Sequence, residues 1–179
     1  MKFKFPLFMT FLSVFWNFSC SSANDSLKIS PRIGEQVISK EINEMTGNYS
    51  SRISYKNVVE EVPHEITTHE TSTRQFSFQL LGNFKSSARK GIRFKKFHFQ
   101  KNTVGDTLIL KNTVELLSIF GKDAHNLFGY NYQIGKEIKV PKNIKFVQIE
   151  LYEMHPTYPK DQRKPVLKSN KLIDLNQIL

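Results

Sequence analysis

The sequence predicts an all-β fold, with an immunoglobulin-like β-sandwich as the best match. Three observations lead to this prediction. Apolar and polar residues alternate with a period of two over several short segments, and turn signals separate these segments. Strand-like segments do not alternate with helix-like ones, as they do in α/β proteins. A length of 179 residues suggests a single domain.

The first element of the domain is predicted as a short N-terminal helix over residues 34–45. Val37, Ile38 and Ile42 recur there at a helical spacing, and the segment contains no proline. Gly47 is suited to end such a helix, because glycine readily adopts a left-handed conformation. A strand remains an alternative for this segment, since Ile and Val favour either structure when the segment is short.

The remaining elements are predicted as strands. Alternation is clearest over residues 75–80 and 147–151. It also runs from Ile92 to Phe99 but changes phase at Lys95 and Lys96, which predicts a β-bulge there. Weaker patterns predict strands at 53–55, 58–62, 108–110, 114–116 and 138–140, and a last hairpin formed by 166–167 and 171–175.

The N-terminus has the layout of a secretory signal peptide. Lys2 and Lys4 form a basic start, twelve mostly apolar residues follow over 5–16, and small polar residues come next. A membrane-spanning helix needs about 20 apolar residues, so this stretch is too short to be one. The sequence therefore predicts export.

Phe18, Ser19 and Cys20 end this region, and the segment resembles the lipobox of bacterial lipoproteins. The resemblance implies cleavage before Cys20 and attachment of lipid to its thiol. It divides the chain into a signal peptide (1–19), a lipidated cysteine with a flexible tether (20–33) and one β-rich domain (34–179). Asn17 departs from the aliphatic residue usual at its position. Cleavage after Ala23 is the alternative, and it gives a soluble secreted protein.

Charge is the next informative feature. The chain carries a formal net charge of +10, which favours anionic partners. The densest basic segment lies between residues 85 and 101 and is interleaved with phenylalanines. Its candidate binding residues are Arg89, Lys90, Arg93, Lys95 and Lys96. The same spacing also describes a half-buried strand with Phe inward and Lys outward, which needs no ligand. An exported protein would meet an anionic glycan, a lipid headgroup or an acidic protein rather than nucleic acid.

No pattern assigns a catalytic residue, a metal ligand or a cofactor. His64 and His69 flank Glu65 in a motif that is similar to a zinc-protease helix, but the spacing between the histidines is five instead of four. Nearby threonines favour a strand, on which residues five apart face opposite ways. A solvated polar strand or loop is the simpler interpretation.

These features predict a non-enzymatic, lipid-anchored protein of the bacterial outer membrane or cell surface. Its β-domain would bind or scaffold another envelope component. Two alternatives stay open at this stage: a secreted or envelope hydrolase with a dispersed site, and a surface adhesin for acidic polymers. Whether the chain has enzymatic activity is left open as well.

Overall fold

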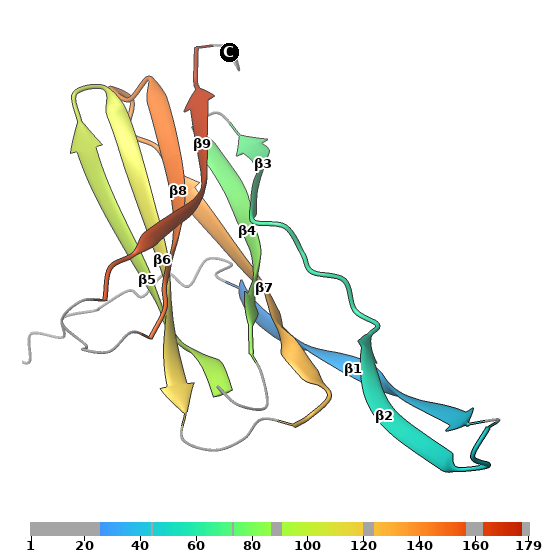
Figure 1. Ribbon diagram of the computed structural model, residues 1–179. Coiled ribbons are helices and arrows are strands. Elements are labelled where there is room, and N and C mark those ends of the chain that lie inside the picture. Colours follow the sequence, from blue (N-terminus) through green and yellow to red (C-terminus); the bar gives the residue numbers. More distant parts are fainter. Residues whose placement is uncertain are drawn as a thin grey trace, which may run out of the picture.

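The computed structural model describes residues 26–43, 45–72, 74–86, 91–119, 124–156 and 163–176. Within these ranges the chain forms nine strands and no helix, so the all-β prediction is confirmed (Figure 1). The strands are β1 (Ser26–Ile42), β2 (Tyr49–Asn57), β3 (Glu65–Ser72), β4 (Gln75–Lys85), β5 (Gly91–Val104), β6 (Thr107–Ile119), β7 (Leu127–Lys139), β8 (Phe146–Met154) and β9 (Val166–Asp174). The described residues contain no helix long and apolar enough to cross a membrane.

The strands form two sheets, as a β-sandwich requires. One sheet has the order β2-β1-β7-β4-β3 and the other the order β5-β6-β8-β9. Neighbouring strands are antiparallel except β6 and β8, which run parallel from the pair Thr107 and Phe146 to the pair Glu115 and Met154. Figure 1 shows the two sheets facing each other over β4 to β9.

The core lies between the sheets and follows from the period of two. Every second residue of a strand points to the same face, so alternating apolar residues build one continuous surface on each sheet. On β4 these residues are Phe76, Phe78, Leu80 and Phe84, all buried. The facing residues of the second sheet are buried as well: Leu108, Leu110, Val114 and Leu116 on β6, and Val147, Ile149 and Leu151 on β8.

The segment predicted as a helix over residues 34–45 is a strand as far as Ile42, where β1 ends, so the helix prediction is wrong there and the strand alternative holds. Val37, Ile38 and Ile42 are β-branched and therefore suit an extended chain. The backbone of β2 pairs with the backbone of this segment. Gly47 adopts a left-handed conformation (φ 67°), but in the turn of a hairpin. Residues 26–33, assigned above to a tether, form the first half of β1 and pair with β7.

Other strands are confirmed with changed boundaries. The predicted β-bulge on β5 is confirmed, because the register with β6 shifts between Phe94 and Lys96. Residues 108–116 lie in the single strand β6, and 166–174 form the single strand β9 rather than a hairpin. Residues 58–62 are not a strand but part of a connector to β3.

The distal half of β1 leaves the sandwich together with β2. Gly34–Ile42 of β1 and Tyr49–Asn57 pair without a register shift, and we call this two-stranded element the arm. Figure 1 shows the arm extending away from the two sheets. Among the described residues, β1 pairs with β7 only up to Ile33.

Candidate functional site

A buried carboxylate, that of Glu153, is the centre of the most concentrated polar cluster in the described residues. Glu153 lies on β8 at the position that continues the inward row of Ile149 and Leu151, and it is 1% exposed. An ionised carboxylate in such a place is strongly destabilising unless donors surround it.

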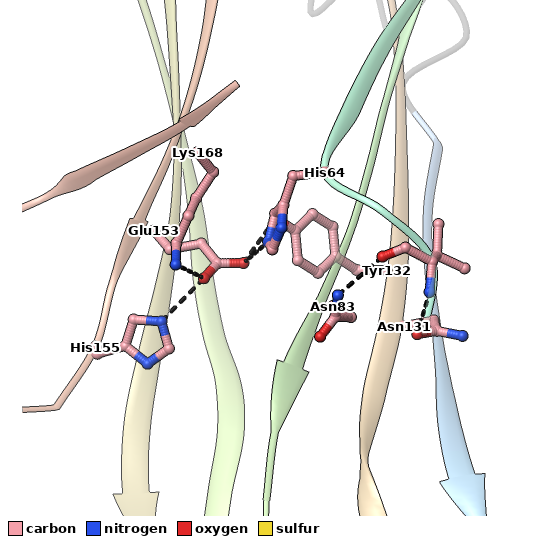
Figure 2. A network of polar contacts seen from close by, with 8 residues as sticks. His64, Asn83, Asn131, Tyr132, Glu153, His155 and Lys168 are labelled. Atoms are coloured by element: carbon pink, nitrogen blue, oxygen red, sulfur yellow. Dashed lines mark hydrogen bonds and ion pairs between the residues drawn. The ribbon is translucent and has the colours of Figure 1, made fainter. Parts of the chain in front are cut away.

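Four donors from four parts of the chain surround this carboxylate (Figure 2). His64 Nε2 and the Tyr132 hydroxyl lie 2.8 and 2.9 Å from Oε1. His155 Nε2 and Lys168 Nζ lie 2.9 and 3.4 Å from Oε2. We call these five residues the Glu153 cluster. Because an ionised carboxylate only accepts hydrogen bonds, Nε2 of each histidine carries the proton.

A glycine on the opposite sheet makes room for this cluster. Gly82 on β4 pairs with Tyr132 on β7. A Cβ atom added to Gly82 would lie 2.3 Å from the Tyr132 hydroxyl and 2.9 Å from Cδ2 of His64. Only the absence of a side chain at this position lets both donors reach across to Glu153.

The connector between β2 and β3, residues 58–64, brings His64 to the cluster. It is attached to the outer face of the five-stranded sheet by two asparagines. Asn131 accepts from the Val62 amide at 3.3 Å and donates to the Glu60 carbonyl at 3.0 Å, and Asn83 donates to the Val62 carbonyl at 2.9 Å. Figure 2 shows this attachment beside the cluster. His64 follows directly and turns inward.

The donors determine the charge of the cluster. Burial alone would raise the pKa of Glu153, but the hydrogen bonds from His155, His64 and Tyr132 outweigh it and hold that pKa at about 2. Burial, together with the Glu153 charge, raises the pKa of Tyr132 above its ordinary value. Glu153 is therefore ionised at neutral pH, with both oxygens occupied, and serves as an electrostatic bridge between the sheets rather than as a proton donor.

A second buried carboxylate, Glu115 on β6, lies on the other face of the same sheet. Lys95 Nζ and His98 Nε2 lie 2.8 and 2.9 Å from its oxygens, and Arg163 Nη1 lies 3.4 Å away. The hydrogen bonds from Lys95 and His98 lower the pKa of Glu115 to about 2. Arg163 also donates to the carbonyls of Leu116 and His155, which joins this second cluster to the first.

The structure describes three of the five basic residues that the sequence predicts as a binding site. Arg93, Lys95 and Lys96 lie on β5 and are exposed, and Lys95 is paired with Glu115 as described. Arg89, Lys90 and Cys20 lie outside the described residues.

The phenylalanines between these basic residues point inward. Phe97 and Phe99 pack against the core, and Lys136 from the opposite sheet lies over both rings, with its Nζ 4.6 Å from the Phe99 ring centre. This is the arrangement of a half-buried strand. Stacking on nucleic-acid bases would need uncovered ring faces.

The two histidines of the zinc-like motif are separated by the fold. His64 points inward to Glu153, whereas His69 on β3 is exposed and five residues away along an extended chain. In the ranges that the structure describes, no three His, Cys, Asp or Glu side chains are grouped so that they could hold a metal ion.

Sequence reasoning missed the two buried carboxylates. One signal for Glu153 was present, because an acid that continues the inward row of an apolar strand must be buried. Tyr132 and Lys168 gave no such signal, since the contacts that bring them to Glu153 join different strands. His155 is only two residues from Glu153, but an isolated histidine after a strand does not indicate a contact. No protein-family model, curated protein or solved structure matches the chain.

Proposed function

We propose that this chain is an exported, lipid-anchored protein of the bacterial cell envelope whose β-sandwich binds an anionic envelope component without catalysing a reaction. The observation that supports this proposal best is a row of basic side chains on the outer face of the four-stranded sheet. The lipid anchor is proposed on the lipobox-like sequence at Cys20.

The pairing of β5 with β6 defines this face. Phe94 pairs with the buried Leu116 and faces the core, whereas Arg93 and Lys96 pair with Leu117 and Glu115 on the outward side. His98 follows on the same side, opposite Thr113. Lys111 extends the row onto β6, where its ammonium lies 4.7 Å from the centre of the Tyr152 ring. A row of this kind attracts anions through the summed field of its charges.

The charge balance of this face also supports an anionic partner. Glu115 is the acid at its centre, and Lys95 and Arg163 already neutralise it. On β5 and β6 this face carries four basic side chains (Arg93, Lys95, Lys96 and Lys111) and one acidic side chain, that of Glu115. Together with the net charge of +10, this excess of bases on the two strands favours a partner that carries several negative charges.

Neutralising this face should weaken binding to anionic surfaces. We expect the double variant Arg93→Gln/Lys96→Gln to bind phosphatidylglycerol vesicles and an acidic polysaccharide about tenfold more weakly than wild type at low salt, because two charge contacts worth about 0.7 kcal/mol each are lost. Wild-type binding should fall steeply as NaCl rises to about 0.5 M. Co-sedimentation and surface plasmon resonance measure both effects.

The matched control is Lys139→Gln/Lys142→Gln, which removes the same charge from two exposed lysines at the end of β7 and in the turn after it. If both double variants lose equal affinity, binding follows net charge alone and this face is not the site. Binding that is independent of salt would exclude an anionic partner.

Lipidation at Cys20 has its own test. The intact mass of the protein purified from its native membrane should correspond to a chain that begins at Cys20 and carries several acyl groups. The Cys20→Ala variant should retain residues 1–19, because the proposed processing requires the modified cysteine. A wild-type chain that begins at Asn24 without lipid would instead establish a soluble secreted protein.

A further inference from the structure

The arm presents an apolar face that nothing in the described chain covers. Ile38 pairs with Ile53, Ile42 with Tyr49, and Gln36 with Tyr55, so their side chains lie on one face of the two-stranded element. The five apolar members of this face are between 37% and 67% exposed, and Lys40 and Ser51 lie on the same face between them. Val58 and Val59, at the start of the connector, are exposed next to it.

A two-stranded ribbon of this kind is only marginally stable in water, and a third strand or a packing partner is usually needed. No strand among the described residues pairs with the outer edge of β2, so a partner can reach it. Proteins commonly protect an edge strand with proline, a bulge or charged side chains. The nine residues of β2 contain no proline, and their register with β1 is continuous from Tyr49 to Asn57. The two charged residues of β2, Arg52 and Lys56, lie on the face opposite the apolar one.

We propose that a second copy of this chain occupies that edge, with β2 pairing antiparallel to β2 across a two-fold axis at Ile53. Both apolar faces then lie on the same side of a four-stranded sheet. Ile38 and Ile53 of one copy continue in a row with Ile53 and Ile38 of the other. Two marginal ribbons become one sheet with a shared apolar face, the arrangement that gives independent stability.

The distribution of charge favours a second copy at this place. The chain as a whole carries +10, so two copies repel each other over most of their surfaces. The segment from Gly34 to Asn57 is balanced, with three acidic residues and three basic ones. In the proposed register Arg52 lies opposite Ser54 and Lys56 opposite Ser50, so no like charges are directly opposed across the axis.

Disulfide trapping tests this register. On a two-fold axis, residue 53 of one copy lies directly opposite residue 53 of the other, with Cα atoms about 4.5–5.5 Å apart, which suits a disulfide. We expect the full-length Ile53→Cys variant, purified in detergent and mildly oxidised, to form at least about ten times more covalent dimer than Tyr49→Cys. Tyr49 and Ile53 are equally exposed, at 59%. Residue 49 would lie about 26 Å from its counterpart, because eight residues of extended chain separate its position from Asn57 opposite it.

Wild type is oxidised in parallel as a control, because Cys20 is its sole cysteine and any covalent dimer it forms must be linked through that residue. Equal cross-linking of both variants, or none in either, overturns the register. A second measurement does not depend on cysteines. Sedimentation velocity should show a dimer for wild type and Tyr49→Lys, and a monomer for Ile53→Lys, which places two like charges directly opposite each other.

Two further outcomes separate this proposal from its alternatives. A monomeric wild type whose binding to phosphatidylcholine vesicles is lost in Ile53→Lys would show that lipid covers the arm, and it would overturn the dimer. The Arg93→Gln/Lys96→Gln variant should remain dimeric, because its substitutions lie on β5. Loss of anion binding and loss of the dimer are therefore distinguishable.

Discussion

Replacement of Glu153 by Ala should lower the free energy of unfolding by about 3–5 kcal/mol, because it removes one member of a buried charged network and leaves the others unpaired. Among the donors, the Tyr132 hydroxyl should contribute most to this loss, because it stays buried without a hydrogen-bond acceptor. Tyr132 is 2% exposed and Glu153 is its hydrogen-bonding partner, so water cannot easily replace the carboxylate. Urea denaturation followed by circular dichroism measures the loss.

Glu150→Ala is the matched control. Glu150 lies three residues earlier on the same strand, on the outer face, where it accepts hydrogen bonds from Tyr152 at 3.0 Å and Gln148 at 2.6 Å. It is half-buried, and its removal should cost about 1 kcal/mol. If both substitutions cost the same, the Glu153 cluster is not the bridge that its geometry indicates.

The same cluster should make the protein sensitive to acid. The pKa of Glu153 is about 2 in the folded chain, below its ordinary value of 4.5. A lowered carboxyl pKa contributes stability that is present above pH 4.5 and is lost as the pH falls toward 2. The part of the wild-type loss that comes from Glu153 should reach about 3 kcal/mol. Glu153→Ala should lose less stability over this range, and identical pH profiles would contradict the assignment.

Gly129→Ala is the second substitution with a large expected effect. Gly129 on β7 has a φ of 150°, and an added Cβ would lie 2.2 Å from the Phe84 carbonyl oxygen and 2.8 Å from Nη2 of the buried Arg32. The oxygen belongs to the backbone of a paired strand and cannot move away by a side-chain rotation. We expect a loss of at least about 3 kcal/mol, from steric overlap and backbone strain together.

Thermal denaturation of Gly129→Ala and Gly105→Ala separates the two causes. Gly105 also has a positive φ, 61°, but no atom lies within 4 Å of its added Cβ. Its substitution should cost only about 1 kcal/mol of backbone strain. Equal losses in the two variants would show that steric overlap of the added Cβ with Phe84 and Arg32 does not contribute to the cost of Gly129→Ala.

The sequence predicted most of the second sheet because its signals are local. The alternations at 92–99 and 147–151 correspond to half-buried strands, and the change of phase at Lys95 corresponds to the β-bulge of β5. The helix prediction for residues 34–45 failed because a short apolar pattern carries little information about which partner it will find. In β1 that partner is β2, whose hydrogen bonds determine the extended conformation.

β7 was largely missed for a related reason. Its inward row includes the polar side chains of Tyr132 and Lys136 among apolar residues, and these two interrupt the alternation of apolar and polar residues. The Glu153 cluster could not be assembled from the sequence either. His155 follows Glu153 closely in the sequence, but the other members come from the connector, β7 and β9, and only the pairing order of the sheets brings these to Glu153. The only local indication of the cluster was the acidic residue Glu153 in the inward row of β8.

The span of these contacts also has a kinetic consequence. His64 and Glu153 are 89 residues apart, and Lys168 joins them from the last strand. The arm and the β5–β6 hairpin form from neighbouring segments, whereas the cluster forms only after the two sheets have met. We expect the contacts of the cluster to form after the main folding barrier, with φ-values near zero, because they need both sheets in place. The Glu153 cluster should therefore lower the unfolding rate of the native protein and leave its folding rate nearly unchanged.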